Sequence, residues 1–196
     1  MKKLICLALA LIMITLPLTA CGDSIPYKKT NEVTNLVIID VKNYGKIVVE
    51  LYPDKAPITV ENFKNLVSEK FYDGLVFHRV IKGFMIQGGG YDTKNKERDA
   101  ASIKGEFSSN GVENDLLHTR GVISMARTSV PDSASSQFFI MHDDAPHLDG
   151  DYAAFGMTVY GIEVVDKIAS VKTNMATNWP KEEVVIKSIR FAVEKD

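Results

Sequence analysis

Hydrophobic and polar residues follow the two-residue period of β-strands along much of the chain after residue 35. Two β-branched runs, 36–41 and 46–52, are separated by Lys42-Asn43-Tyr44-Gly45, which predicts a hairpin because glycine tolerates a positive φ. In the second run, alternating apolar positions predict one strongly buried face. Similar runs predict further strands over residues 76–81, 85–88, 121–126, 137–141, 153–159 and 184–193.

Two segments have helical periodicity instead. A helix is predicted after Pro57, with Thr59 as its N-cap, and a second helix is predicted over residues 163–169. Residues 91–109 are polar, which predicts a long loop. Many short strands with few helices favour a β-sandwich or a closed β-barrel, because closure removes exposed strand edges.

The first twenty residues follow another pattern. Lys2 and Lys3 precede an apolar run over residues 4–16, which only Thr15 interrupts, and small residues follow. A positive start, an apolar stretch and a small-residue exit are typical of a secretory signal peptide. The run is shorter than the roughly 20 residues that span a bilayer, so an uncleaved transmembrane anchor is the weaker alternative.

Leu18-Thr19-Ala20-Cys21 resembles the lipobox of bacterial lipoproteins. The resemblance implies cleavage before Cys21 and a thiol that carries a diacylglyceryl group, with acyl chains such as palmitate; an ordinary secreted protein is the alternative. Two acyl chains anchor a protein stably where one chain is marginal. We therefore expect a signal peptide over 1–20, a flexible tether over 21–35 and one domain over 36–196, lipid-anchored on the extracytoplasmic face of the cell membrane.

Composition and charge limit the function classes. The chain has 196 residues, of which 45% are hydrophobic and 24% charged, as in a single globular domain. Removal of residues 1–20 takes away two lysines and no acid, so the net charge of −2 becomes about −4. Nucleic-acid binding is not expected, because it requires a basic face. Cys6 leaves with the signal peptide, so Cys21 has no partner for a disulfide.

Three motifs bring arginine, glutamine and aromatic residues together. Phe77-His78-Arg79-Val80-Ile81 leads through Lys82-Gly83 into Phe84-Met85-Ile86-Gln87-Gly88-Gly89-Gly90. Ser135-Ser136-Gln137-Phe138-Phe139-Ile140 and His147-Leu148-Asp149-Gly150 follow. In a regular strand, alternation would place the side chains of residues 77 and 79 on the same face. We interpret the three glycines as a turn at the end of a strand.

In this order, the motifs resemble the cyclophilin family of peptidyl-prolyl cis-trans isomerases, from about residue 36 to residue 193. The resemblance implies a mainly β fold, an eight-stranded closed antiparallel β-barrel capped by two α-helices, with the active site on the outer face. It also implies isomerisation of Xaa-Pro bonds in proline-containing polypeptides. The reaction needs no cofactor and no metal, because no bond is made or broken. We expect a monomer that assists the folding of exported proteins at the membrane, since slow prolyl steps limit folding.

The resemblance also implies roles for individual residues. The catalytic set comprises Arg79, Phe84 and Gln87. The substrate-binding positions are Phe77, Met85, Ala126, Arg127, Gln137, Phe139, His147, Leu148 and Tyr152. Many relatives have Asn where Arg127 stands, and Tyr152 occupies a site that is His in many eukaryotic members. His147 stands where cyclosporin-sensitive members have a tryptophan, which puts cyclosporin binding in doubt more than catalysis.

Other interpretations rest on weaker patterns. His142-Asp143-Asp144 with His147 could suggest a metal site, and serines near His142 could suggest a hydrolase, although no Gly-x-Ser-x-Gly turn is present. A cyclophilin-like barrel that only displays partners would not need the catalytic set. A barrel with a ligand in its lumen would need smaller or more polar strands. We expect His118 at the surface and His78 beneath the site, neither of them catalytic.

Overall fold

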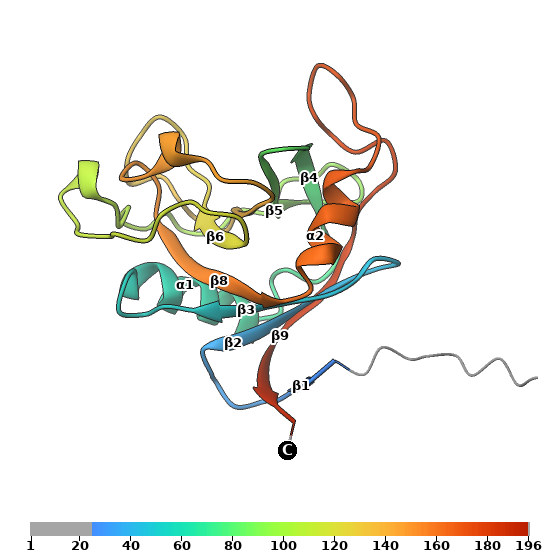
Figure 1. Cartoon of the computed structure of the whole chain (residues 1–196), viewed down its shortest axis with the longest axis horizontal. Coiled ribbons are helices and arrows are strands. Elements are labelled where there is room, and N and C mark those ends of the chain that lie inside the picture. The colour runs from blue at the N-terminus through green and yellow to red at the C-terminus, as the bar shows by residue number, and fades with distance from the viewer. Residues whose placement is uncertain (1–24, 196) are drawn as a thin grey trace, which may run out of the picture.

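The computed structural model describes residues 25–195, which form one strongly curved β-sheet with two α-helices (Figure 1). The strands are β1 (Tyr27–Lys29), β2 (Leu36–Val41), β3 (Gly45–Leu51), β4 (Leu75–Ile81), β5 (Met85–Asp92), β6 (Val122–Met125), β7 (Phe138–Met141), β8 (Ala154–Tyr160) and β9 (Ile186–Glu194). The helices are α1 (Pro57–Ser68) and α2 (Ile162–Ala169), and 3₁₀ turns lie at Ser108–Asn110 and Pro146–Leu148. All eight predicted strands and both predicted helices are confirmed, with ends shifted by up to four residues.

Residues 25–35 lie against the domain, which corrects this part of the predicted tether over 21–35; residues 21–24 lie outside the described part of the chain. β1 pairs antiparallel with the end of β9, where Tyr27 lies opposite Glu194. Ile25 is 5% exposed and belongs to a small apolar cluster with Ile38 and Val48, on the outer face of β2 and β3. A polar strand that contributes mainly backbone hydrogen bonds leaves little trace in the hydropathy pattern. The predicted signal peptide and Cys21 lie outside the described residues.

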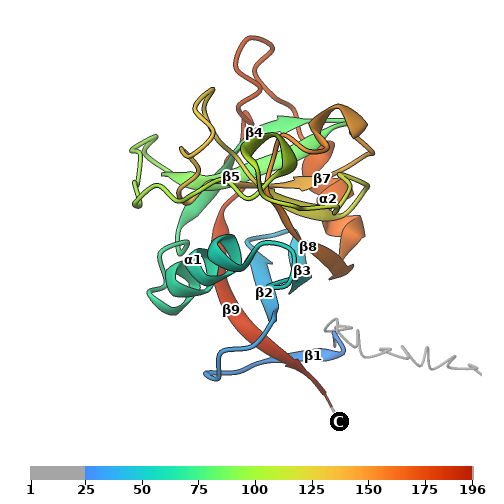
Figure 2. The ribbon, with the colours of Figure 1, turned by 90° about the vertical axis from the view of Figure 1, so that its left-hand side faces the viewer.

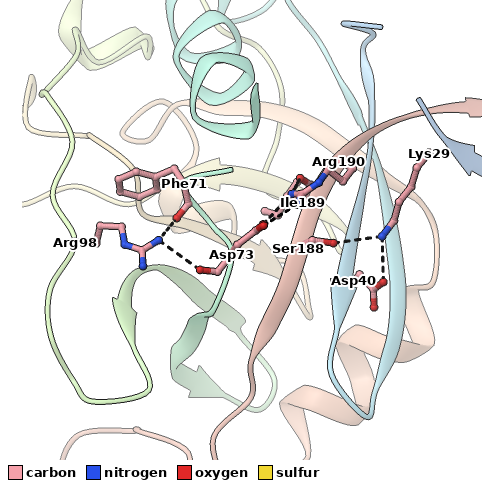
Figure 3. A network of polar contacts seen from close by, with 8 residues as sticks. All are labelled: Lys29, Asp40, Phe71, Asp73, Arg98, Ser188, Ile189 and Arg190. Carbon is pink, nitrogen blue, oxygen red and sulfur yellow. Dashed lines mark hydrogen bonds and ion pairs between the residues drawn. The ribbon is translucent and has the colours of Figure 1, made fainter. Parts of the chain in front are cut away.

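Lys29 links β1 to its neighbour β9 and to β2, the next strand of the sheet. Its ammonium group lies 3.3 Å from the carboxylate of Asp40 on β2 and 3.3 Å from the hydroxyl of Ser188 on β9 (Figure 3). These side-chain contacts add to the backbone pairing of a strand that is only three residues long.

The strand order is β1-β9-β2-β3-β8-β6-β7-β5-β4, and the paired strands are antiparallel. β1 pairs with the C-terminal end of β9. Near the N-terminal end of β9, Val185 forms an isolated bridge with Val76 of β4, and Gly74 N donates to Ile186 O at 2.9 Å. The described sheet therefore has nine strands in an open order. Its ladders do not confirm the expected closure of eight strands into a barrel.

An ion pair holds the two sides of this junction together. Arg190 of β9 donates from both terminal nitrogens to the carboxylate of Asp73, at 2.8 and 2.6 Å (Figure 3). Arg98 binds the same turn by donating to the carbonyl oxygens of Phe71 and Asp73. Two arginines from distant parts of the chain thus fix the turn that leads into β4.

Both helices bury their apolar faces in the same core as the strands; Figure 2 shows α1 and α2 well apart, at the left and right of the view. Pro57 opens α1, where its missing N–H is not needed. The N-cap is Ala56, so the prediction of Thr59 was wrong. A carboxylate from the 91–109 loop, Glu106, caps the first turn instead. No helix in the described residues is long and apolar enough to cross a bilayer.

The three glycines at 88–90 lie inside β5, which corrects their interpretation as a turn. A side chain at Gly90 would lie 2.6 Å from the side chain of Gln137, and one at Gly88 would lie 3.0 Å from Phe77. Glycine at 88 and 90 therefore lets neighbouring residues pack directly against the backbone.

Candidate active site

Nine of the twelve predicted site residues line one surface cavity of about 210 Å³. They are Arg79, Phe84, Met85, Gln87, Ala126, Arg127, Phe139, Leu148 and Tyr152. They come from β4, β5, β7, the turn between β4 and β5, and the segments that follow β6 and β7. The three remaining predictions, Phe77, Gln137 and His147, have other positions.

A β-bulge places Arg79 in this cavity. Phe77 pairs with Gly88 and Arg79 with Gln87, so β4 advances by two residues where β5 advances by one. The extra residue breaks the alternation of side chains, so Phe77 and Arg79 point to different faces of the strand. Bulges commonly redirect side chains in this way. Phe77 is fully buried in the main core, so its prediction as a substrate-binding residue was wrong.

Hydrogen bonds orient the guanidinium of Arg79. NH1 donates to Gln87 Oε1 at 3.3 Å, and Gln87 Nε2 donates to Gln137 Oε1 at 3.0 Å. Because the amide nitrogen of Gln87 has its own acceptor, its oxygen is left facing Arg79. NH1 also lies 3.9 Å from the sulfur of Met85. The arginine is therefore held in place at the side of the cavity before any substrate arrives.

Another part of the cavity lining is apolar. Met85, Phe139 and Leu148 are all less than 10% exposed and belong to a second hydrophobic cluster, against which Phe84 packs. A wall that is already packed loses little conformational entropy on binding. Apolar side chains beside the oriented guanidinium of Arg79 fit a small apolar ring that carries a polar group.

Arg127 forms the rim of the cavity. Its guanidinium carbon lies 4.6 Å from the ring centre of Tyr152 and 5.0 Å from that of Phe107. Its Nε donates to Asp151 O and its NH1 to Thr128 O, both at 2.9 Å. A second hollow adjoins the cavity and shares three residues with it; it is lined by Gln87, Glu97, Ala126, Arg127, Thr128, Ser133, Ser135 and Gln137. Gln137 therefore borders the neighbouring hollow.

His147 lies next to the cavity without lining it. Its ring stacks on Phe84 with the ring centres 5.5 Å apart and an interplanar angle of 29°. His147 is exposed, so it supports one wall from the solvent side.

His118 is buried behind the cavity, and the prediction of a surface position was wrong. Its Nδ1 lies 3.0 Å from Asp149 and its Nε2 lies 3.0 Å from the hydroxyl of Ser124, while its ring stacks on Phe139. Burial lowers the pKa of His118, and Asp149 opposes that change. The Ser-His-Asp arrangement does not form a hydrolase site, because Ser124 is fully buried. Residues 118, 124 and 149 are distant in sequence, and no local motif indicated their contact.

His78 is also buried and packs against Tyr91 and Trp179, whose ring centres are 4.8 and 5.6 Å away. Its Nδ1 has no hydrogen-bond partner, and burial lowers the pKa of His78 to about 4. Within residues 25–195, no group of three His, Cys, Asp or Glu side chains is placed to hold a metal ion.

Comparisons with known proteins agree with this geometry. Residues 36–191 match the family model described as cyclophilin type peptidyl-prolyl cis-trans isomerase/CLD. The chain is 50% identical over 158 residues to a peptidyl-prolyl cis-trans isomerase of Acinetobacter baylyi, which covers 76% of this chain and 81% of that protein. It is 43% identical over 158 residues to peptidyl-prolyl cis-trans isomerase B of Escherichia coli, with coverage of 75% and 94%.

A solved structure shows the same fold. The cyclophilin type isomerase of Cryptosporidium parvum, crystallised in the presence of the dipeptide Ala-Pro, matches with a TM-score of 0.68 at 30% identity. The match covers 80% of this chain and 98% of that chain. The chain therefore belongs to the cyclophilin-type family of peptidyl-prolyl cis-trans isomerases.

Proposed function

We propose that this isomerase is anchored by a lipid on Cys21 and accelerates the folding of exported proteins at the extracytoplasmic membrane surface. The observation that carries the catalytic part is the Arg79 guanidinium, oriented by Gln87 beside the apolar side chains of the cavity. The anchor is supported by the lipobox-like sequence before Cys21.

The chemistry of prolyl isomerisation suits such a site. The partial double bond of a peptide sets a barrier of about 18–20 kcal/mol, and lowering it by about 5–7 kcal/mol gives a 10⁴- to 10⁵-fold acceleration. In the twisted transition state the amide nitrogen regains a lone pair, which a fixed guanidinium can bind. This hydrogen bond does not exist in the planar ground state, so it favours the transition state selectively.

Each side of the cavity has a separate role in this proposal. Arg79 donates to the prolyl nitrogen, and one preorganised donor contributes about 3–4 kcal/mol. Phe84, Met85, Phe139 and Leu148 hold the ring and disfavour the more polar planar amide. Burial of a ring gains only about 0.8 kcal/mol per methylene, so we expect weak binding with little sequence preference beyond proline.

The length of chain between Cys21 and the first buried residue limits how far the domain could lie from a membrane. Ile25 is already buried against the sheet, so only residues 22–24 separate the domain from Cys21. At about 3.6 Å per residue, the chain from residue 21 to residue 25 reaches at most about 14 Å. We therefore expect the domain to lie directly at the membrane surface.

An assay on the full-length chain tests the catalytic part. We expect Arg79→Ala to lower kcat/KM on a proline tetrapeptide by about 10²-fold or more. Lys94→Ala, an exposed change in the 91–109 loop, serves as the control and should retain activity. Full activity of Arg79→Ala would refute the assigned role and would favour a barrel that only binds partners.

The location is tested separately through Cys21→Ser. We expect the wild type to incorporate labelled palmitate and to sediment with membranes, and the variant to do neither. On vesicles, the wild type should accelerate the slow folding phase of an exported protein more than either Cys21→Ser or Arg79→Ala. Equal acceleration by Cys21→Ser would contradict the role at the membrane without affecting the isomerase assignment.

A further inference from the structure

The turn between β4 and β5 is held by one residue at two points. The backbone N–H of His142 donates to Phe84 O at 2.9 Å, and the N–H of Gly83 donates to the ring nitrogen Nδ1 of His142 at 3.1 Å. Within the turn, Phe84 N already bonds Ile81 O. Gly83 has a φ of +77°, a backbone conformation that glycine adopts more easily than other residues.

The other ring nitrogen of His142 faces α2. Its Nε2 lies 3.4 Å from the carboxylate of Asp166, which also accepts a hydrogen bond from Arg120 at 2.8 Å. Arg120 additionally donates to the carbonyl oxygen of His142 at 2.6 Å. Because Nδ1 accepts the N–H of Gly83, the proton of the neutral ring must be on Nε2, which faces Asp166.

This turn carries one residue of the apolar wall and joins the two strands that hold Arg79 and Gln87. Phe84 follows Gly83 directly and forms part of the apolar wall, while Arg79 and Gln87 lie opposite each other on the two strands that the turn joins. A change in the Gly83 peptide would therefore move the wall relative to the catalytic arginine. Shifts of about 1 Å at such sites can lower rates by as much as 10²-fold.

We propose that His142 is a positioning residue for the isomerase site, because its ring nitrogen Nδ1 holds the N–H of Gly83. Two further hydrogen bonds, from the backbone N–H groups of His142 and Asp143 to Phe84 O, hold the next residue of the turn. Loss of the ring acceptor therefore frees the Gly83 peptide while Phe84 O stays bound. The inference rests on the isomerase activity of the family.

Charged groups from two other elements pack around the ring. Asp166 of α2 lies 3.4 Å from its Nε2, and Arg120 from the segment before β6 pairs with the same carboxylate at 2.8 Å. On His142's own segment, Asp144 accepts the backbone N–H of Arg120 at 2.8 Å, and Asp143 accepts the N–H of Asp144 at 2.9 Å. From the β4–β5 turn, the contacts are made by the backbone of Gly83 and Phe84.

Two substitutions in the full-length chain test the proposal. His142→Asn keeps an acceptor oxygen near the place of Nδ1 and cannot be protonated, whereas His142→Ala removes the acceptor. At pH 8 we expect kcat/KM to fall about fivefold in the Ala variant, as for one lost hydrogen bond, and to stay within about twofold of wild type in the Asn variant. Equal loss in both variants, or no loss in either, would overturn the proposal.

The amide resonance of Gly83 tests the contact without any activity measurement. We expect its hydrogen exchange to be faster in His142→Ala than in the wild type, and close to the wild-type rate in His142→Asn. An inactive wild type with a protected Gly83 amide would contradict the isomerase assignment alone. An active wild type whose Gly83 amide exchanges at the same rate as in His142→Ala would contradict the role of His142.

Discussion

The carboxylate of Glu106 accepts two hydrogen bonds from Thr59, one from its backbone N–H and one from its hydroxyl, each at 2.7 Å. A third comes from the backbone N–H of Ile58 at 3.0 Å. Glu106 and Thr59 are both almost completely buried. A carboxylate at the start of a helix satisfies unpaired N–H groups and interacts favourably with the helix dipole. The long polar loop is thereby attached to α1.

Glu106→Gln should destabilise the fold by about 1–3 kcal/mol, because an amide NH₂ would face backbone donors and leave buried groups unpaired. Denaturant unfolding monitored by circular dichroism measures this change. Glu113→Gln removes an exposed carboxylate from the same region and should change the free energy of unfolding by less than about 0.5 kcal/mol. Similar stabilities for the two variants would show that the cap is not required.

Truncation of Phe77 should lower mainly stability, and truncation of Phe84 should lower mainly catalytic activity. Phe77→Ala leaves a cavity in the main core and should cost about 3–5 kcal/mol of unfolding free energy. Phe84→Ala removes part of the cavity wall, so it should lower kcat/KM about tenfold or more while the protein remains folded. Unfolding and isomerase measurements on both variants separate the two roles. A stable but inactive Phe77→Ala would contradict the position of the Phe77 side chain in the core rather than in the cavity.

Gln87 should act through Arg79. With Gln87→Ala, the guanidinium loses its 3.3 Å partner, and we expect kcat to fall about tenfold with a smaller change in KM. A double-mutant cycle checks this relationship, because Gln87→Ala should have little further effect once Arg79→Ala is present. Additive losses would indicate that Gln87 contacts the substrate independently.

Acid should destabilise the protein through its buried histidines. Burial lowers the pKa of His78 to about 4, below its ordinary value, so the unfolded chain binds this proton more tightly than the folded chain. The stabilisation is complete above the unfolded value of about 6.5 and is lost as the pH falls towards 4, by up to roughly 3 kcal/mol. His118 contributes with the same sign, because burial lowers its pKa too.

The variant His78→Phe checks this dependence by denaturant unfolding at pH 7 and pH 4.5. Phenylalanine suits the contacts with Tyr91 and Trp179 and cannot be protonated. We expect its unfolding free energy to fall less with acid than that of the wild type. An equal fall would mean that other groups cause the acid sensitivity.

The order of secondary structure could be predicted because it depends on local periodicity. The β2–β3 hairpin follows from two β-branched runs and a turn that ends in Gly45, whose φ is +126°. The motifs around Arg79 and Phe139 likewise identified most of the cavity lining. These patterns lie within continuous stretches of chain, so the sequence carries them directly.

The sequence by itself therefore determined which segments form strands and helices, and which residue types carry the chemistry. The tertiary structure decided which way side chains face and which distant groups meet. The bulge in β4 separates Phe77 from Arg79, against simple alternation. β1 joins the sheet through backbone hydrogen bonds that its polar residues do not reveal. Glu106 caps a helix 47 residues away. Each outcome depends on long-range pairing, which exists only once the sheet has brought remote segments together.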